Sequence, residues 1–284
     1  MRSFAVRNLK VFFRDRTSVF FSLLAVFIII GLYVLFLGDV WTSGMQNMSG
    51  VRFLMDSWIM AGLLAVTSMT TTMGAFGIMV EDKVRKISKD FYSSPIKRSA
   101  LTSGYIIGSY IIGVIMTLIT VVLAEIYIVA NGGSLMSFEI LLKVIGLILL
   151  STLTNTSIIL FIVSFFKSSN AFATASTIIG TLIGFLTGIY LPVGQLPDSV
   201  QFVIKVFPVS HAAALMRQVM MDVPLSNTFA GAPTAATLEF RQFMGVDLKF
   251  GETTVSVLVS IGILVLTAVV FFLLSMFNLS RKNK

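Results

Sequence analysis

The sequence of 284 residues offers few side chains for catalysis. It has no cysteine and a single histidine, His211, so disulfide and thiolate chemistry are excluded and little remains for a metal site. Glu125 is the only carboxylate well inside a predicted membrane span, where it could bind a cationic substrate or be satisfied at the interface. A membrane enzyme would need acid, base or metal groups that converge, and the predicted spans hold no paired glutamates or histidines. We therefore expect a chain that is not an enzyme and binds neither a metal nor a cofactor.

The other polar residues inside the predicted spans are mostly hydroxyls. They cluster at 67–72, at 151–157 and at 174–181, with Gly180 and Gly184 at small-xxx-small spacing. Such residues either pack helix against helix or line a substrate path, and the sequence leaves both open. The candidates for a substrate path are Thr71, Glu125, Asn155 and Thr177. Because no ring of charges is present, an amphipathic or lipid-like cargo fits better than a small ion.

The composition shows which elements must position these residues. The chain is 56% hydrophobic and 12% charged, with a mean hydropathy of +0.94, and it has too few polar residues to clothe a soluble globule. A helix needs about twenty apolar residues to cross the hydrocarbon. Six segments meet that length: Val19–Gly38, Trp58–Val80, Leu101–Val129, Leu141–Phe165, Ala171–Tyr190 and Val255–Leu279.

The basic residues predict the orientation. With the N-terminus inside, fifteen of the 21 lysines and arginines fall in inner segments and five in outer ones, and Lys143 lies just inside the fourth span, four residues after Glu139. This distribution fits the positive-inside rule, so we expect both termini in the cytoplasm. The net charge of +8 then reflects topology and contact with anionic lipid, and not binding of nucleic acid.

Two inner segments are more than simple connections. In residues 1–17, Val6, Leu9 and Phe13 predict an apolar face on an interfacial helix, although a basic anchor that only fixes topology would look similar. In residues 81–100, Val84, Ile87 and Phe91 predict a second apolar stripe, with charges on the other face and Pro95 ending the helix. This segment suits a surface that docks another protein; the alternative is a solvated charge run.

The longest outer segment, 191–252, begins with two short amphipathic helices. Pro197 and Asp198 predict the start of the first, whose apolar face is Val200, Val203, Ile204 and Phe207 and whose end is set by Pro208. Ser210 could cap the second helix, over Ala212–Met221, with Leu215 and Met216 facing inward. Each helix is too short to span, so we expect a hairpin that enters the outer leaflet and returns, or a pair that rests on the outer surface.

The stretch "GIYLPVGQLPDSVQFVIKVFPVSHAAALMR" resembles the hallmark region of the ABC-2 type permeases, the transmembrane subunits of ATP-binding-cassette exporters with the type V exporter fold. The matching positions are Gly188, Pro192, Leu196, Pro197, Pro208, Ser210, His211 and Arg217. The inner segment adds Glu81, Ser94, Pro95, Ile96 and Arg98. The resemblance implies an all-α polytopic protein with one transmembrane domain over 1–284, comprising an interfacial helix (1–17), a coupling loop (81–100) and a re-entrant hairpin and loop (191–252).

The resemblance also implies a function and partners. Such permeases form dimers, here a homodimer, and recruit two separate ATP-binding subunits, which would hold ATP and magnesium because this chain has no G-x-x-x-x-G-K-[ST] loop. The expected function is export of an amphipathic, drug-like or lipid-like substrate, as in multidrug efflux, across a bacterial plasma membrane; an ATP-independent channel or scaffold is the alternative. The residues expected to couple to the ATPase are Glu81, Val84, Lys86, Ile87, Phe91, Pro95 and Arg98. Those expected to form the re-entrant gate are Gly188, Pro192, Leu196, Pro197, Pro208, His211 and Arg217.

Overall fold

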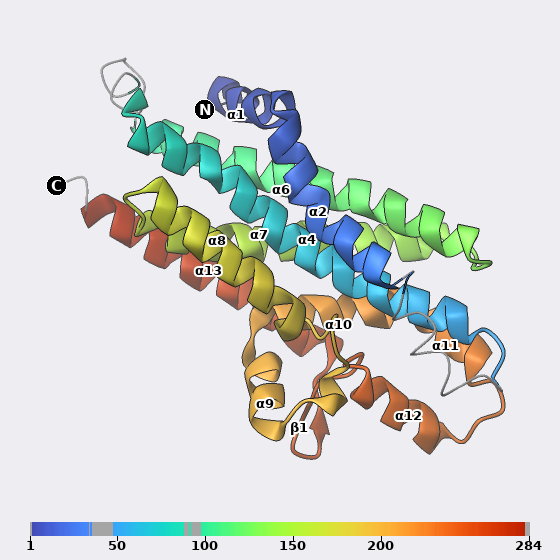
Figure 1. Ribbon diagram of the computed structural model, residues 1–284. Coiled ribbons are helices and arrows are strands. Elements are labelled where there is room, and N and C mark those ends of the chain that lie inside the picture. The colour runs from blue at the N-terminus through green and yellow to red at the C-terminus, as the bar shows by residue number, and fades with distance from the viewer. Residues whose placement is uncertain (1, 34, 36–47, 88–90, 92–97, 282–284) are drawn as a thin grey trace.

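The computed structural model consists of helices and one short strand pair, and it describes residues 2–33, 35, 48–87, 91 and 98–281. The elements in chain order are α1 (Arg2–Arg14), α2 (Arg16–Leu32), α4 (Val51–Val84), α6 (Arg98–Ala130), α7 (Phe138–Ser164), α8 (Ser169–Leu186), η2 (Val193–Gln195), α9 (Asp198–Val206), α10 (Pro208–Met220), α11 (Asp222–Thr228), α12 (Thr234–Phe243), β1 (Lys249–Phe250), β2 (Thr253–Thr254) and α13 (Val257–Arg281). Long helices lie side by side, with α1 near one end of the bundle and α9 and α12 at the other (Figure 1). We call these the α1 end and the hairpin end.

The fold is that of a multi-pass membrane protein. Within the described residues, α4, α6, α7, α8 and α13 are each long and apolar enough to cross a membrane. Two bent pairs, α1–α2 and α9–α10, would raise the number of spans to seven if each pair crossed once. The prediction of six spans lies inside this range, with α2 as the first span and α9–α10 as the hairpin. The end of the first predicted span, at 36–38, is outside the described residues.

The central helix is α4, which packs against α2, α6, α7, α8, α10 and α11. Its 34 residues would extend about 51 Å at 1.5 Å per residue, more than the hydrocarbon thickness. It begins at Val51, earlier than the predicted Trp58, because the charges in its first turns are paired. Arg52 Nε lies 3.1 Å from Asp56 Oδ1, and Arg52 Nη2 donates to the Tyr127 hydroxyl at 2.9 Å.

Hydroxyl groups pack α4 against α7 in the interior. Ser68 Oγ and Thr152 Oγ1 are 3.0 Å apart, and Asn155 Nδ2 donates to Ser68 Oγ at 3.0 Å. Opposite them Gly113 of α6 is required, because a Cβ there would lie 2.6 Å from Thr72 Oγ1. Paired hydroxyls and close backbone approach are the means by which helices associate in lipid. For these residues the structure supports packing.

α1 is buried in the protein along a different face from its predicted apolar stripe, whose contact with the membrane interface stays a prediction. Phe4, Ala5, Asn8 and Phe12 are buried, whereas Val6 is 40% and Phe13 36% exposed. The buried face is the one in contact with α6, on which α1 packs. The more exposed apolar residues are those left for the interface.

The hairpin is bent where proline predicts a bend. Pro197 precedes α9, Pro208 is the first residue of α10, and the two helices meet at 86°. The prediction that Ser210 caps the second helix is wrong, because α10 already begins at Pro208. Ser210 Oγ instead donates to Leu186 O at 2.6 Å and ties α10 to the end of α8. Leu215 and Met216 are buried, as predicted.

Candidate transmission site and membrane groove

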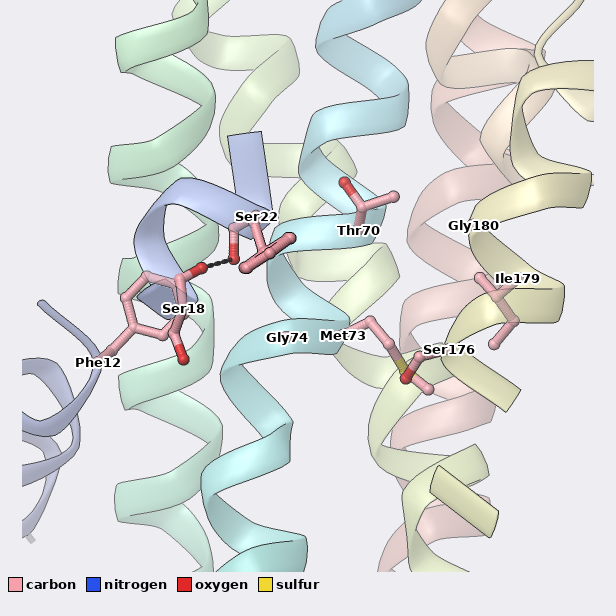
Figure 2. A pocket seen from close by; sticks show the side chains of 10 residues that line it. Phe12, Ser18, Ser22, Thr70, Met73, Gly74, Ser176, Ile179 and Gly180 are labelled. Carbon is pink, nitrogen blue, oxygen red and sulfur yellow. Dashed lines mark hydrogen bonds between the residues drawn. The ribbon is translucent and has the colours of Figure 1, made fainter. Parts of the chain in front are cut away.

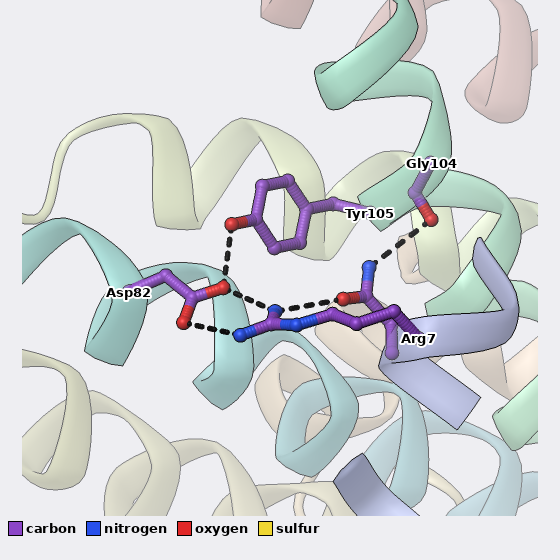
Figure 3. Close-up of polar contacts among 5 residues, drawn as sticks. Arg7, Asp82, Gly104 and Tyr105 are labelled. Carbon is purple, nitrogen blue, oxygen red and sulfur yellow. Dashed lines mark hydrogen bonds and ion pairs between the residues drawn. The ribbon is translucent and has the colours of Figure 1, made fainter. Parts of the chain in front are cut away.

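An ion pair joins α1 to the end of α4 (Figure 3). Arg7 Nη2 donates to Asp82 Oδ1 at 2.9 Å, and Nη1 pairs with the second carboxylate oxygen, so the contact is bidentate. Tyr105 of α6 donates its hydroxyl proton to Asp82 Oδ2 at 2.7 Å. These hydrogen bonds to Asp82 raise the pKa of the Arg7 guanidinium. A buried carboxylate thus holds three helices together.

The same face of α1 is fitted closely to α6. Asn8 Nδ2 donates to Gly104 O at 3.3 Å, and a Cβ at Gly104 would lie 2.6 Å from Phe4 Cδ1. The Phe4 ring packs edge-on against Tyr105, with centroids 4.9 Å apart, and against Phe91, at 5.1 Å. The interfacial helix therefore contacts α4, α6 and the segment between them. We call Phe4, Arg7, Asp82, Phe91 and Tyr105 the α1 clamp.

Residues expected to couple to the ATPase lie around this clamp but not on one helix. α4 ends at Val84, Arg85 N donates to Glu81 O at 2.8 Å, and Lys86 has a left-handed φ of 62°. The predicted stripe of Val84, Ile87 and Phe91 on a single helix is therefore wrong, because the αL residue turns the chain.

The coupling residues also differ in exposure. Val84 and Lys86 are exposed, and Glu81 pairs with Arg85 at 2.7 Å on the surface. Ile87 lines the cavity described next, and Phe91 is partly buried in the α1 clamp. Arg98 begins α6, and Pro95 is outside the described residues.

A cavity of about 520 Å³ opens beside the clamp. Its lining includes Arg7, Asp15, Glu81, Asp82 and Arg85, so both signs of charge face it. Asp15 also starts α2, because its carboxylate accepts from Thr17 N at 3.1 Å and from Ser18 N at 3.3 Å. A hydrogen bond from the Ser18 hydroxyl to Asp15 Oδ2, at 2.6 Å, and these backbone hydrogen bonds lower the pKa of Asp15.

A groove of about 330 Å³ continues from this cavity between α2, α4 and α8 (Figure 2). Phe12, Ser18 and Gly74 line both spaces. Farther along, the walls alternate hydroxyl and apolar groups: Ser22, Thr70, Met73, Ser176 and Ile179. The combined surface leads from the α1 end into the membrane-spanning part of the bundle.

The predicted gate residues lie together around the hairpin. Gly188, with φ 64°, turns the chain after α8, and Pro192 lies just before η2. Leu196 O accepts from Gln201 at 2.9 Å, which joins the chain before Pro197 to α9. His211 Nε2 lies 2.9 Å from Lys205 O and Nδ1 lies 3.1 Å from Ser260 Oγ. A carbonyl only accepts, so Nε2 carries a proton. His211 thereby fixes α10 to α9 and α13.

Arg217 connects the hairpin to the central helix. Its side chain is buried, donates to Gly188 O at 3.1 Å and to Gly245 O at 3.4 Å, and its Cζ lies 4.8 Å from the centre of the Trp58 ring. Trp58 Nε1 donates to Met244 O at 2.7 Å. The family pattern supplied Arg217, but nothing in the sequence indicated Trp58 as its partner.

The four candidates for a substrate path are not brought together. Thr71 and Asn155 are buried in the packed interior, Thr177 is exposed on α8, and Glu125 lies near the hairpin end of α6. Thr70 directly precedes Thr71 and Ser176 directly precedes Thr177, and these two preceding residues line the groove. Arg7 and Asp82 were missed as a pair. The only sequence signal was a second acid directly after Glu81 at the end of a span.

Multiple spans, an N-terminal helix clamped to the end of a span and a bent helix pair before the last span define a multi-pass α-helical membrane protein. A family model described as "ABC-2 family transporter protein" matches residues 42–277. The chain belongs to this family, and the matched domain is a permease, a transport subunit without a catalytic domain. An ABC-2 permease implies a partner subunit that binds ATP. No curated protein sequence matches the chain.

Proposed function

We propose that the chain is the permease half of an exporter that pairs with a second copy of itself and with two ATP-binding subunits. It moves an amphipathic, drug-like or lipid-like substrate out of the cytoplasm or the inner leaflet by alternating access. ATP and magnesium bind the partner subunits. Both termini and the α1 end face the cytoplasm, and the hairpin end faces outward, as the concentration of basic residues near the α1 end favours.

The observation that carries this proposal is the groove of α2, α4 and α8, which shares Phe12, Ser18 and Gly74 with the cavity beside the α1 clamp. It starts at a charged cavity beside the α1 clamp and continues between aromatic, thioether and hydroxyl groups. A surface of this mixture suits a cargo with an apolar body and polar substituents. The α1 clamp lies at its entrance, so movement of the segment docked on the ATPase would reach the groove through α1 and α4.

The groove can be blocked without disturbing the rest of the protomer. A Cβ at Gly180 on α8 meets no atom within 4 Å, and the same is true at Gly262 on α13. Gly180→Phe should therefore fill the groove, while Gly262→Phe places an equal ring on a helix away from it. We expect Gly180→Phe to lower transport by the reconstituted complex at least tenfold and Gly262→Phe to leave it unchanged.

Assembly with the ATP-binding subunit, measured by size-exclusion chromatography, should be normal in both variants. Normal transport by an assembled Gly180→Phe complex would show that the groove is not on the route. Transport that persists without any ATP-binding subunit would contradict the exporter itself.

A further inference from the structure

A separate cavity of about 250 Å³ lies at the hairpin end. Its walls come from α4, α6, the 131–137 connection, the start of α7 and the α10–α11 corner. Most of the lining is apolar, including Phe53, Ile128, Ile140 and Met220. None of its lining residues lines the groove or the cavity beside the α1 clamp. Whatever it binds, it is a different site.

Glu125 is the charged residue in this lining. Its Oε2 accepts the backbone N–H of Met136 at 3.0 Å. Its Oε1 is buried and has no hydrogen-bond partner among the described residues. The basic residues nearby are already engaged, since Arg52 pairs with Asp56 and Lys143 with Glu139. Glu125 is thus the one charged residue in a mainly apolar lining, and its Oε1 receives no hydrogen bond from the described residues.

The connection that closes the cavity is built to hold Glu125 in this position. Gly132 has a φ of 86°, and a Cβ at Gly133 would lie 2.5 Å from Ile128 Cγ2 and 2.7 Å from Phe53 Cδ2. Only glycine allows this tight turn against both walls. The turn brings Met136 N–H onto one oxygen of Glu125 and leaves the other without a hydrogen bond from the described residues.

An unpaired carboxylate oxygen in an apolar wall is costly, and a ligand that supplies a charged donor removes that cost. The volume is just below the range of drug-sized pockets, so the ligand or its bound part is small. We propose that this cavity binds small amphipathic ammonium cations. The ammonium group donates to the Glu125 carboxylate, and the hydrocarbon lies between Phe53, Ile140 and Met220. Ser134 and Leu135, which are exposed at its rim, place the entrance at the hairpin end.

Binding can be measured on the purified full-length chain by calorimetry, independently of transport. Hexylammonium is the probe, and hexanol and hexanoate are matched neutral and anionic controls. We expect the Kd of hexylammonium to be at least tenfold lower than that of either control. Glu125→Gln retains an oxygen for Met136 N–H but removes the charge, and should raise the Kd at least tenfold. Glu139→Gln, on an exposed residue at the same end, should not change it.

A second variant tests the cavity rather than the charge. Ile140→Trp keeps Glu125 and fills the apolar wall, so hexylammonium binding should be lost although the protein retains its thermal unfolding transition. Equal affinity for hexylammonium and hexanol, or unchanged binding in Glu125→Gln, would overturn the proposal. If Gly180→Phe blocks transport and these binding results fail, the proposed exporter stands and this site does not.

Discussion

At the scale of single residues, the Arg7–Asp82 pair is asymmetric. The Arg7 side chain is 32% exposed and that of Asp82 is 5% exposed. An arginine without its partner can still be hydrated from the cavity beside the clamp. A carboxylate without its partner would stay buried with only the Tyr105 hydroxyl. The two halves of the pair should therefore respond differently to removal.

We expect Arg7→Met to destabilise the protein by about 2–3 kcal/mol, because it leaves the buried carboxylate of Asp82 nearly alone. Asp82→Asn should cost about 1 kcal/mol, and the double variant should be more stable than Arg7→Met. At roughly 2–4 °C per kcal/mol, the Arg7→Met midpoint of thermal unfolding should fall by about 4–12 °C. Lys10→Met, on an exposed residue of the same helix, is the control. Equal losses in the two single variants would contradict the asymmetry.

Individual side chains also show which contacts can be predicted from the sequence and which cannot. The candidates near the hairpin were found because they match the family pattern, and the ends of its two helices because proline restricts the backbone locally. Arg7 and Asp82 are 75 positions apart, and the Trp58–Met244 hydrogen bond spans 186. An amphipathic pattern shows that α1 has an apolar side, but it does not predict which helix will pack against α1. Long-range partners of this kind come only from the assembled bundle.

At the scale of elements, the turn after α4 is the exposed part of the coupling segment. Val84 is 41% exposed, and Lys86 is exposed in a left-handed conformation. Phe91 instead packs on Phe4, and the Arg7 guanidinium lies 5.5 Å from its ring centre. The segment thus has an outward part that a partner can contact and an inward part that contacts α1.

These two parts should separate in experiments. Val84→Asp combined with Lys86→Glu should weaken binding of the ATP-binding subunit at least tenfold, because both side chains lie on the exposed turn. Phe91→Ala should leave that affinity within about twofold and lower substrate-stimulated ATPase activity, because it loosens the α1 clamp. Affinity and ATPase activity are measured on the same preparations. Lys167→Glu, also exposed and in the connection between α7 and α8, is the charge control. Unchanged binding in the turn variant would move the docking surface elsewhere.

The spans themselves were predictable, since length and hydropathy alone define a helix that crosses a bilayer. Their ends were not. The predicted second span began at Trp58 because Arg52 and Asp56 interrupt the apolar run, yet the helix starts at Val51. The two charges neutralise each other and reach Tyr127 on α6. A hydropathy average counts both charges as unfavourable, because it contains no information on their pairing or on a hydrogen bond to a neighbouring helix.

At the scale of the whole molecule, α8 and α13 are both largely exposed but differ in what they expose. Along α13 the exposed residues are large and apolar, such as Leu258, Leu266 and Leu273, as expected for a surface in contact with lipid. Along α8, Thr174, Thr177 and Thr181 are exposed at i, i+3 and i+7, beside large apolar residues such as Ile178 and Leu182. Within its own chain α8 packs chiefly on α4. Small hydroxyl residues on a membrane helix favour contact with another helix, so α8 is the surface that a second copy would cover.

The absence of cysteine from the sequence makes this arrangement directly testable. In a symmetric dimer, a residue near the two-fold axis faces its own copy. Thr177→Cys should therefore form a disulfide-linked dimer when membranes are oxidised, because a disulfide requires Cα atoms within roughly 7 Å. Leu266→Cys, which is 63% exposed on α13 in the wild-type chain, should remain monomeric on a non-reducing gel. The linked dimer should retain assembly with the ATP-binding subunit, and its transport should recover on reduction if the two α8 helices move apart during each cycle. Cross-linking of Leu266→Cys without cross-linking of Thr174→Cys, Thr177→Cys or Thr181→Cys would place the second copy against α13 and not against α8.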